Sequence, residues 1–223
     1  MPPRRSSGRG RALSRDRIVQ CALHIVDEEG LEALTMRRLG AALGVEAMSL
    51  YGHVQNKEAL LDLVQEAVLA ELEEVPAEGD WRTRLRHAAH AYRNVLGRHP
   101  NALPLFATRW VRTPQAIAVV EVVLEVLRKA GLSELDCAYA FDAFTAYVVG
   151  QAFSQWGDRR RLTPEQFVEE HVGALSQLPP ERFPTVAAVL PGLQHFDFEA
   201  NFTFGLECLL DGLAARLRPC ERS

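Results

Sequence analysis

Three residues in the first third of the chain, Ser14, Thr35 and Asn56, each begin a run of apolar residues at helical spacing. Serine, threonine and asparagine are among the residues that cap helix N-termini best, so each run predicts a helix that begins there. Gly30 and Gly44 follow the first two runs, and glycine readily adopts the left-handed conformation that ends a helix. The N-terminal region must therefore fold as short, separately capped helices.

These caps and stops predict a helix-turn-helix motif. We expect helices over about 14–29, 35–43, 47–53 and 56–74. The second and third are short and are joined by a turn that contains Gly44 and the apolar Val45. In this motif the first short helix crosses the phosphate backbone of DNA and the second enters the major groove.

The rest of the chain predicts a larger helical domain. A linker over 75–80 contains Pro76 and Gly79, and no segment beyond it shows strand alternation. We expect further helices near 81–98, 102–109, 113–130, 134–156, 163–177 and 199–217. The predicted fold class is all-α, with a disordered basic arm over 1–13, a three-helix DNA-binding domain with its connecting helix over 14–75, and a ligand-binding and dimerisation domain over 76–223.

Charge is distributed unevenly along the chain. Residues 1–17 hold six arginines and one aspartate, whereas the whole chain has a net charge of −4. A basic end suggests a polyanionic partner that contacts only that end. A solvated tail that aids solubility explains the same charge equally well.

Several function classes are excluded. The chain has no run of the roughly 18 apolar residues that a membrane span needs, and its basic N-terminus is not followed by the apolar segment of a secretory signal. Its four cysteines are far apart, and its histidines form no zinc-binding pattern. We find no phosphate loop or nucleophile elbow. We therefore expect a cytoplasmic protein that is not an enzyme and needs no metal or cofactor.

Residues 14–72 resemble the DNA-binding domain of the TetR family of bacterial regulators. The most specific features are Tyr51, His53 and the block Asn56-Lys57-x-x-Leu60-Leu61. The resembling stretches are 18–23, 30–39, 43–45 and 50–62. The C-terminal half resembles the tetracycline repressor branch more weakly, at Trp81, Thr108-Arg109, 202–207 and Gly212-Leu213.

The resemblance implies roles for eight residues at the DNA. Five of them lie at positions where members of the family contact phosphates, namely Thr35, Ser49, Tyr51, His53 and Lys57. Those at positions that meet base edges are Arg37, Ala47 and Met48. Arginine can contact guanine through two hydrogen bonds, whereas Ala47 and Met48 can at most contact thymine methyl groups. Thr35 could instead only cap its helix, and Tyr51 could be a packing aromatic.

The resemblance also implies a homodimer held by a four-helix bundle, with the helices over 138–156 and 202–217 from each chain. Both segments are rich in apolar and small residues at helical spacing. Ordinary core helices would show the same composition. Residues 116–127 are almost wholly apolar and predict a buried central helix.

Aromatic and polar residues are mixed in the C-terminal domain, as in a site for a small apolar effector. The candidate ligand-binding residues are Tyr92, Phe106, Arg109, Trp110, Phe144, Tyr147 and Gln151. The same residues could be ordinary core. The metal-bearing histidine of the tetracycline repressor falls at about Leu105 or Phe106, neither of which can ligate magnesium, so the resemblance implies neither tetracycline nor a metal as ligand.

We therefore expect a sequence-specific transcriptional regulator, a repressor that a small apolar molecule of unknown identity releases from operator double-stranded DNA. The alternative is a helical ligand-binding or enzymatic protein with a vestigial helix-turn-helix. The basic arm and the presence of Tyr51, His53 and Lys57 favour the regulator.

Overall fold

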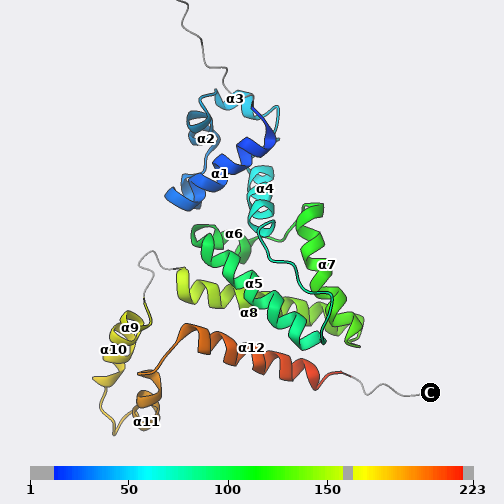
Figure 1. Cartoon of the computed structure of the whole chain (residues 1–223). Helices are drawn as coiled ribbons and strands as arrows, with labels where there is room; N and C mark the ends of the chain where they lie inside the picture. Colours follow the sequence, from blue (N-terminus) through cyan, green and yellow to red (C-terminus); the bar gives the residue numbers. More distant parts are fainter. Residues whose placement is uncertain (1–12, 158–162, 218–223) are drawn as a thin grey trace, which may run out of the picture.

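The computed structural model describes residues 13–157 and 163–217, and these residues form helices and no strand (Figure 1). This confirms the all-α fold. The basic arm lies almost wholly outside the described residues. Within the described ranges, no helix is long and apolar enough to cross a bilayer.

The N-terminal part is a small helical unit with α1 and α4 packed against each other. Its elements are α1 (Arg15–Glu29), the 3₁₀ turn η1 (Leu31–Ala33), α2 (Met36–Leu43), α3 (Ala47–Leu50) and α4 (Lys57–Leu69). The expected caps begin their helices, since Ser14 Oγ accepts a hydrogen bond from the Arg17 amide at 3.3 Å and Asn56 Oδ1 accepts one from the Ala59 amide at 2.8 Å. Ile18 and Leu60 are fully buried between α1 and α4.

The C-terminal part is built around α8, which contacts α5, α6, α7 and α12 (Figure 1). Its helices are α5 (Trp81–Arg98), η2 (Pro100–Ala102), α6 (Leu103–Thr108), α7 (Pro114–Lys129), α8 (Glu134–Trp156), α9 (Pro164–Phe167), η3 (Val168–Val172), α10 (Gly173–Ser176), α11 (Pro184–Leu193) and α12 (Phe198–Ala214). Phe144 and Phe202 are its largest fully buried side chains.

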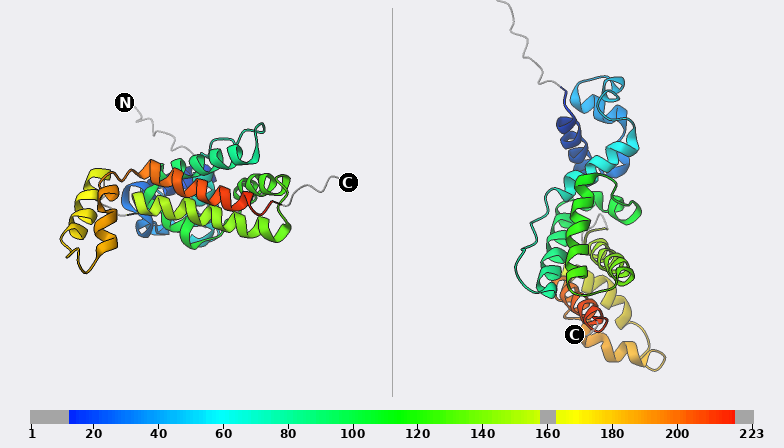
Figure 2. Two further views of the ribbon diagram at one scale, coloured as in Figure 1. Left: turned by 90° about the horizontal axis from the view of Figure 1, so that it is seen from below. Right: turned by 90° about the vertical axis from the view of Figure 1, so that its right-hand side faces the viewer.

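Helices α9, η3, α10 and α11 form a projection that stands apart from the rest of the chain (Figures 1 and 2). They contact one another more than they contact the other helices. An aromatic cluster ties the projection to the start of α12, since Phe167 stacks on Phe196 with ring centroids 4.6 Å apart and Phe198 meets both rings edge-on.

Several expected boundaries were wrong. The helix α3 ends at Leu50 rather than near 53, and α4 ends at Leu69 rather than near 74. The helix α11 was not expected, because Pro191-Gly192 was interpreted as a stop between segments. Pro191 instead lies inside α11, and the helix ends only two residues later. A proline at this position cannot donate to the carbonyl four residues before it, so it interrupts the helix near its end rather than preventing it.

The prediction that 116–127 form a buried central helix was also wrong. Of the residues in α7, only Ala116, Val123, Val126 and Leu127 are buried, and the Ile117 side chain is 48% exposed. The segment is apolar on more than one side because one side packs on α8 and another lines a cavity.

Candidate nucleic-acid interface and ligand cavity

The turn between α2 and α3 depends on two glycines. Gly44 ends α2 in the left-handed conformation at φ 71° and ψ 30°, which favours glycine. Gly40 lies where the two helices meet, and a Cβ atom there would lie 2.9 Å from the Val45 carbonyl oxygen and 3.2 Å from the Ala47 amide nitrogen. The close approach of α2 and α3 therefore requires a residue without a side chain.

The structure places the eight candidate DNA-binding residues on the outer surface of α2, α3 and the start of α4. Thr35, Arg37, Ser49, His53 and Lys57 are exposed. Two further members expose large apolar area, with Met48 75% and Tyr51 46% exposed, and Ala47 is half-buried. The exposure of Met48 and Tyr51 has no explanation in the packing of this chain, and an exposed apolar patch indicates a binding surface.

The two arginines of α2 differ in whether their guanidinium groups have an ionic partner among the described residues. Arg38 is paired with Glu29 of α1, with Nε donating to a carboxylate oxygen at 3.0 Å, and this contact lowers the pKa of Glu29. Arg37 forms no ion pair or hydrogen bond through its side chain with any described residue, so its guanidinium is available to a partner. Thr35 caps α2 by accepting from the Arg38 amide at 3.0 Å, and its hydroxyl hydrogen can still be donated elsewhere.

Beneath this surface lies an apolar core. Leu39, Leu50 and Val54 are buried. Leu43 and Val45 are half-buried against them. This packing fixes α2 and α3 relative to each other.

A histidine joins the N-terminal unit to the C-terminal helices. His99, at the end of α5, is 8% exposed. Its Nδ1 lies 3.0 Å from both carboxylate oxygens of Asp27 in α1, and its Nε2 lies 3.2 Å from a carboxylate oxygen of Glu71, just beyond α4. Asn101 adds a hydrogen bond to the Asp27 carbonyl oxygen at 2.7 Å. Movement of α1 relative to α5 must therefore disturb a partly buried polar cluster.

A large cavity lies among α4, α5, α6, α7 and α8, with a volume of about 1140 Å³. Its inner wall is apolar and includes the buried residues Leu69, Ala88, Val123, Phe144 and Val149. The volume of the cavity exceeds the roughly 300–1,000 Å³ of ordinary small-molecule sites. The cavity can therefore hold a ligand with several rings.

Five of the seven candidate ligand-binding residues line this cavity, namely Tyr92, Phe106, Arg109, Trp110 and Phe144. The other two do not. Tyr147 donates a hydrogen bond to the Phe202 carbonyl oxygen at 2.6 Å, and Gln151 accepts one from Asn201 at 3.0 Å, so both hold α8 against α12.

Sequence reasoning missed several residues of the cavity wall. These are Gln65 of α4, the acidic residues Glu73, Glu74 and Asp142, and the valines of α7. The one available signal was the wide apolar surface of 116–127, in which Glu121 and Glu125 are the only charged residues, because so wide an apolar surface has to contact either protein or ligand.

Arg109 connects the cavity wall to α4. Its guanidinium forms ion pairs with Glu58 and Asp62, and Gln65 Nε2 donates to its carbonyl oxygen at 3.4 Å. The Arg109 guanidinium lowers the pKa of Glu58. Lys57, the candidate phosphate contact, precedes Glu58 in the first turn of α4, so one helix touches both the cavity and the outer surface.

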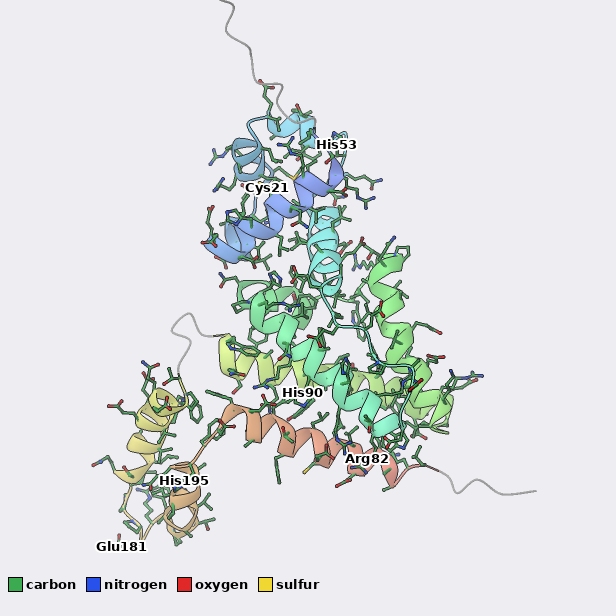
Figure 3. All side chains as sticks on the ribbon, in the orientation of Figure 1. Cys21, His53, Arg82, His90, Glu181 and His195 are labelled. Carbon is green, nitrogen blue, oxygen red and sulfur yellow. The ribbon has the colours of Figure 1, made fainter. Side chains whose placement is uncertain are left out.

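The histidines do not gather into a metal site. Figure 3 shows His53 at one end of the molecule, beside α3, and His195 at the opposite end. Across residues 13–157 and 163–217, no group of three or more His, Cys, Asp or Glu side chains is arranged so that it could hold a metal ion.

Two family models match the chain. One, described as bacterial regulatory proteins of the tetR family, matches residues 18–64. The other, described as a tetracyclin repressor-like C-terminal domain, matches residues 75–217.

Individual proteins match over nearly the whole chain. An HTH-type transcriptional repressor, DrrR1 from Streptomyces coeruleorubidus, is 37% identical over 94% of this chain and 80% of its own length. The tetracycline repressor protein class D from Escherichia coli is 30% identical over 92% of this chain and 91% of its own. Among solved structures, the TetR family protein ActR from Streptomyces coelicolor in complex with actinorhodin is 34% identical and superimposes with a TM-score of 0.83, covering 92% of this chain and 98% of its own.

Proposed function

The chain belongs to the TetR family of DNA-binding transcriptional regulators, and we propose that it is a homodimeric repressor that leaves its operator when a small molecule fills the cavity. One observation carries the proposal. The chain has an exposed surface on α2, α3 and the start of α4, and it also has a large cavity that is lined in part by α4.

At the operator, we assign Thr35, Ser49, Tyr51, His53 and Lys57 to the phosphates. Lys57 lies in the first turn of α4, where free backbone N–H groups and the helix dipole also attract phosphate. Arg37 reads base edges, with Ala47 and Met48 restricted to apolar contacts. Because α3 carries few polar readers, much of the specificity then rests on Arg37 and on DNA shape.

The exposed faces of α8 and α12 support the homodimer. On α8, Leu135 is 61% and Tyr139 65% exposed, and on α12 Phe204 is 72% exposed. On α12, Gly212 also has open space where a Cβ would lie. The helices lie side by side (Figure 2). Two such pairs would bury these side chains in a four-helix bundle.

Sedimentation tests the dimer. The double variant Tyr139→Glu/Phe204→Glu places four like charges in the proposed bundle, so we expect it to sediment as a folded monomer while the wild type sediments as a dimer. Met48→Glu changes a side chain of similar exposure, 75%, on α3 and serves as the matched control that stays dimeric. A monomeric wild type at micromolar concentration would contradict the proposal.

The cavity supports an effector role. The relative ActR has been crystallised in complex with actinorhodin, and the cavity of the present chain has room for a compound with several rings. We propose a large, mostly apolar effector. A screen for compounds that release a bound operator fragment tests this. In Val119→Trp the indole should fill part of the cavity, so release by the same compound should weaken while operator binding persists.

We propose regulation rather than catalysis as the role of this chain, because its named relatives are transcriptional regulators. A regulator of bacterial transcription acts where the chromosome lies, so we place its action in the cytoplasm.

A further inference from the structure

From the side chains that line the cavity, we infer that the effector is a multi-ring apolar compound that carries a protonated amine, and that compounds with an anionic group are disfavoured. This inference rests on the proposed function, because it assumes that the cavity is the effector site. It adds the charge of the ligand and the positions at which the ligand's polar groups lie.

The charged side chains of the cavity are unbalanced. Three carboxylates line it, those of Glu73, Glu74 and Asp142, and all three residues are exposed, so they lie toward its mouth. None of these carboxylates forms an ion pair or a side-chain hydrogen bond with another described residue. They are therefore free to bind a cation.

The basic side chain in the wall cannot offset these charges. Arg109 is the one lysine or arginine among the described residues that line the cavity, and its guanidinium is held by the carboxylates of Glu58 and Asp62 on α4. An anionic ligand would have to compete with two carboxylates for this guanidinium. It would also meet three further negative charges at the mouth, which costs binding energy.

Deeper in the cavity, Tyr92 provides a polar group without a partner. Its ring meets the Phe106 ring edge-on with centroids 6.1 Å apart, and both residues line the cavity. The Tyr92 hydroxyl forms no hydrogen bond with any described residue, and burial raises its pKa, so it is a neutral phenol. A ligand carbonyl or hydroxyl oxygen could accept a hydrogen bond from this donor.

These groups define the orientation of the ligand. The apolar rings lie against Phe106, Phe144 and the valines of α7, an oxygen faces Tyr92, and the amine reaches the carboxylates at the mouth. Because these carboxylates are exposed to solvent, each contributes modestly, about 2- to 5-fold in affinity. Their joint contribution should decrease as salt is added.

Two dyes with the same xanthene ring system test the charge preference. Rhodamine 6G is cationic, and fluorescein is anionic at neutral pH. We expect the full-length protein, in fluorescence anisotropy titrations, to bind rhodamine 6G at least about 10-fold more tightly at low salt, and the difference to shrink at high salt. Val119→Trp should weaken the binding of rhodamine 6G, which locates the dye in the cavity.

Matched variants assign the preference to the three carboxylates. In the triple variant Glu73→Gln/Glu74→Gln/Asp142→Asn the preference for the cation should fall to about 3-fold or less. The control triple variant Glu78→Gln/Glu121→Gln/Glu169→Gln makes the same change in net charge at exposed positions outside the cavity lining and should retain the preference. Tyr92→Phe should weaken rhodamine 6G binding and leave the salt dependence unchanged.

Two results would overturn the inference in distinguishable ways. Equal or tighter binding of fluorescein in the cavity would contradict the charge preference and leave the ligand-binding role standing. Failure of either dye to bind, together with failure of every compound in the release screen, would contradict the proposed effector role and the inference with it.

Discussion

Arg37 and Arg38 are adjacent in the chain but differ in what they can bind. Arg38 is held by Glu29, whereas the exposed guanidinium of Arg37 has no partner among the described residues. We predict that Arg37→Ala costs about 1–3 kcal/mol of operator binding and relaxes one base position. Arg38→Ala, the matched control, should change operator affinity by less than about 1 kcal/mol, because it breaks an exposed ion pair.

Binding titrations against the operator and against single-base variants of it measure both effects. If Arg37→Ala weakened all sequences equally, Arg37 would be a phosphate contact rather than a base reader.

Gly40 is the residue on which the geometry of the motif depends most. The Cβ of Gly40→Ala would lie 2.9 Å from the Val45 carbonyl oxygen, so α2 and α3 would have to separate. We expect a loss of about 1–3 kcal/mol in the free energy of unfolding, since overpacking forces backbone shifts. In Gly52→Ala, the control, the nearest atom is 3.7 Å away. Urea titration should find Gly52→Ala as stable as the wild type, and an equal loss in both variants would contradict this account.

At the scale of elements, α12 is fastened to α5 by an ion-pair cluster. Glu207 accepts hydrogen bonds from Arg86 and Arg82, and these guanidinium groups lower its pKa from 4.5 to about 2. Because the pKa of Glu207 is lower in the folded state, the contact makes its full contribution to the free energy of unfolding at pH values above the unfolded pKa. This contribution is then lost as the pH falls from about 4.5 toward 2.

We therefore predict that the wild type loses stability between about pH 5 and about pH 3, by roughly 1 kcal/mol more than Glu207→Gln, once screening by solvent is allowed for. Urea unfolding at a series of pH values compares the two proteins. Parallel pH profiles would show that Glu207 does not couple α12 to α5.

Sequence patterns predicted where the helices lie better than they predicted what each helix face contacts. The caps Ser14, Thr35 and Asn56 act locally, so their helices begin where expected. Composition also identified the segments of α7 and α8 as rich in apolar residues, but it does not distinguish a face that packs on a helix from one that lines a cavity. For this reason Tyr147 and Gln151 were grouped with Tyr92, although they face α12.

At the scale of the whole molecule, α4 connects the cavity to the outer surface. Arg109 in the cavity wall holds Glu58 and Asp62, and His99 joins α1 to α5 through Asp27. A ligand that displaces Arg109 changes the contacts of the helix that carries Lys57. An effector can shift the DNA-binding equilibrium only by its difference in affinity between two such arrangements, and these contacts are where that difference can arise.

The basic arm provides a prediction at the same scale, although residues 1–12 lie outside the described residues. It holds Arg4, Arg5, Arg9 and Arg11 and no acid. Deletion of residues 1–11 should weaken specific and non-specific DNA binding by similar factors, and the loss should shrink as salt rises because fewer counterions are released. Titrations at several salt concentrations measure this. Unchanged affinity at low salt would leave the arm as a solvated tail.

The most direct test of the central claim is selection of bound DNA from a random-sequence library by the full-length protein. A dimer that reads DNA through α3 should enrich a palindromic site whose half-sites lie about 34–36 Å apart, or a multiple of one helical turn. Addition of a cavity-binding compound should release that site. Recovery of unenriched sequences, or no DNA binding at any salt concentration, would contradict the account.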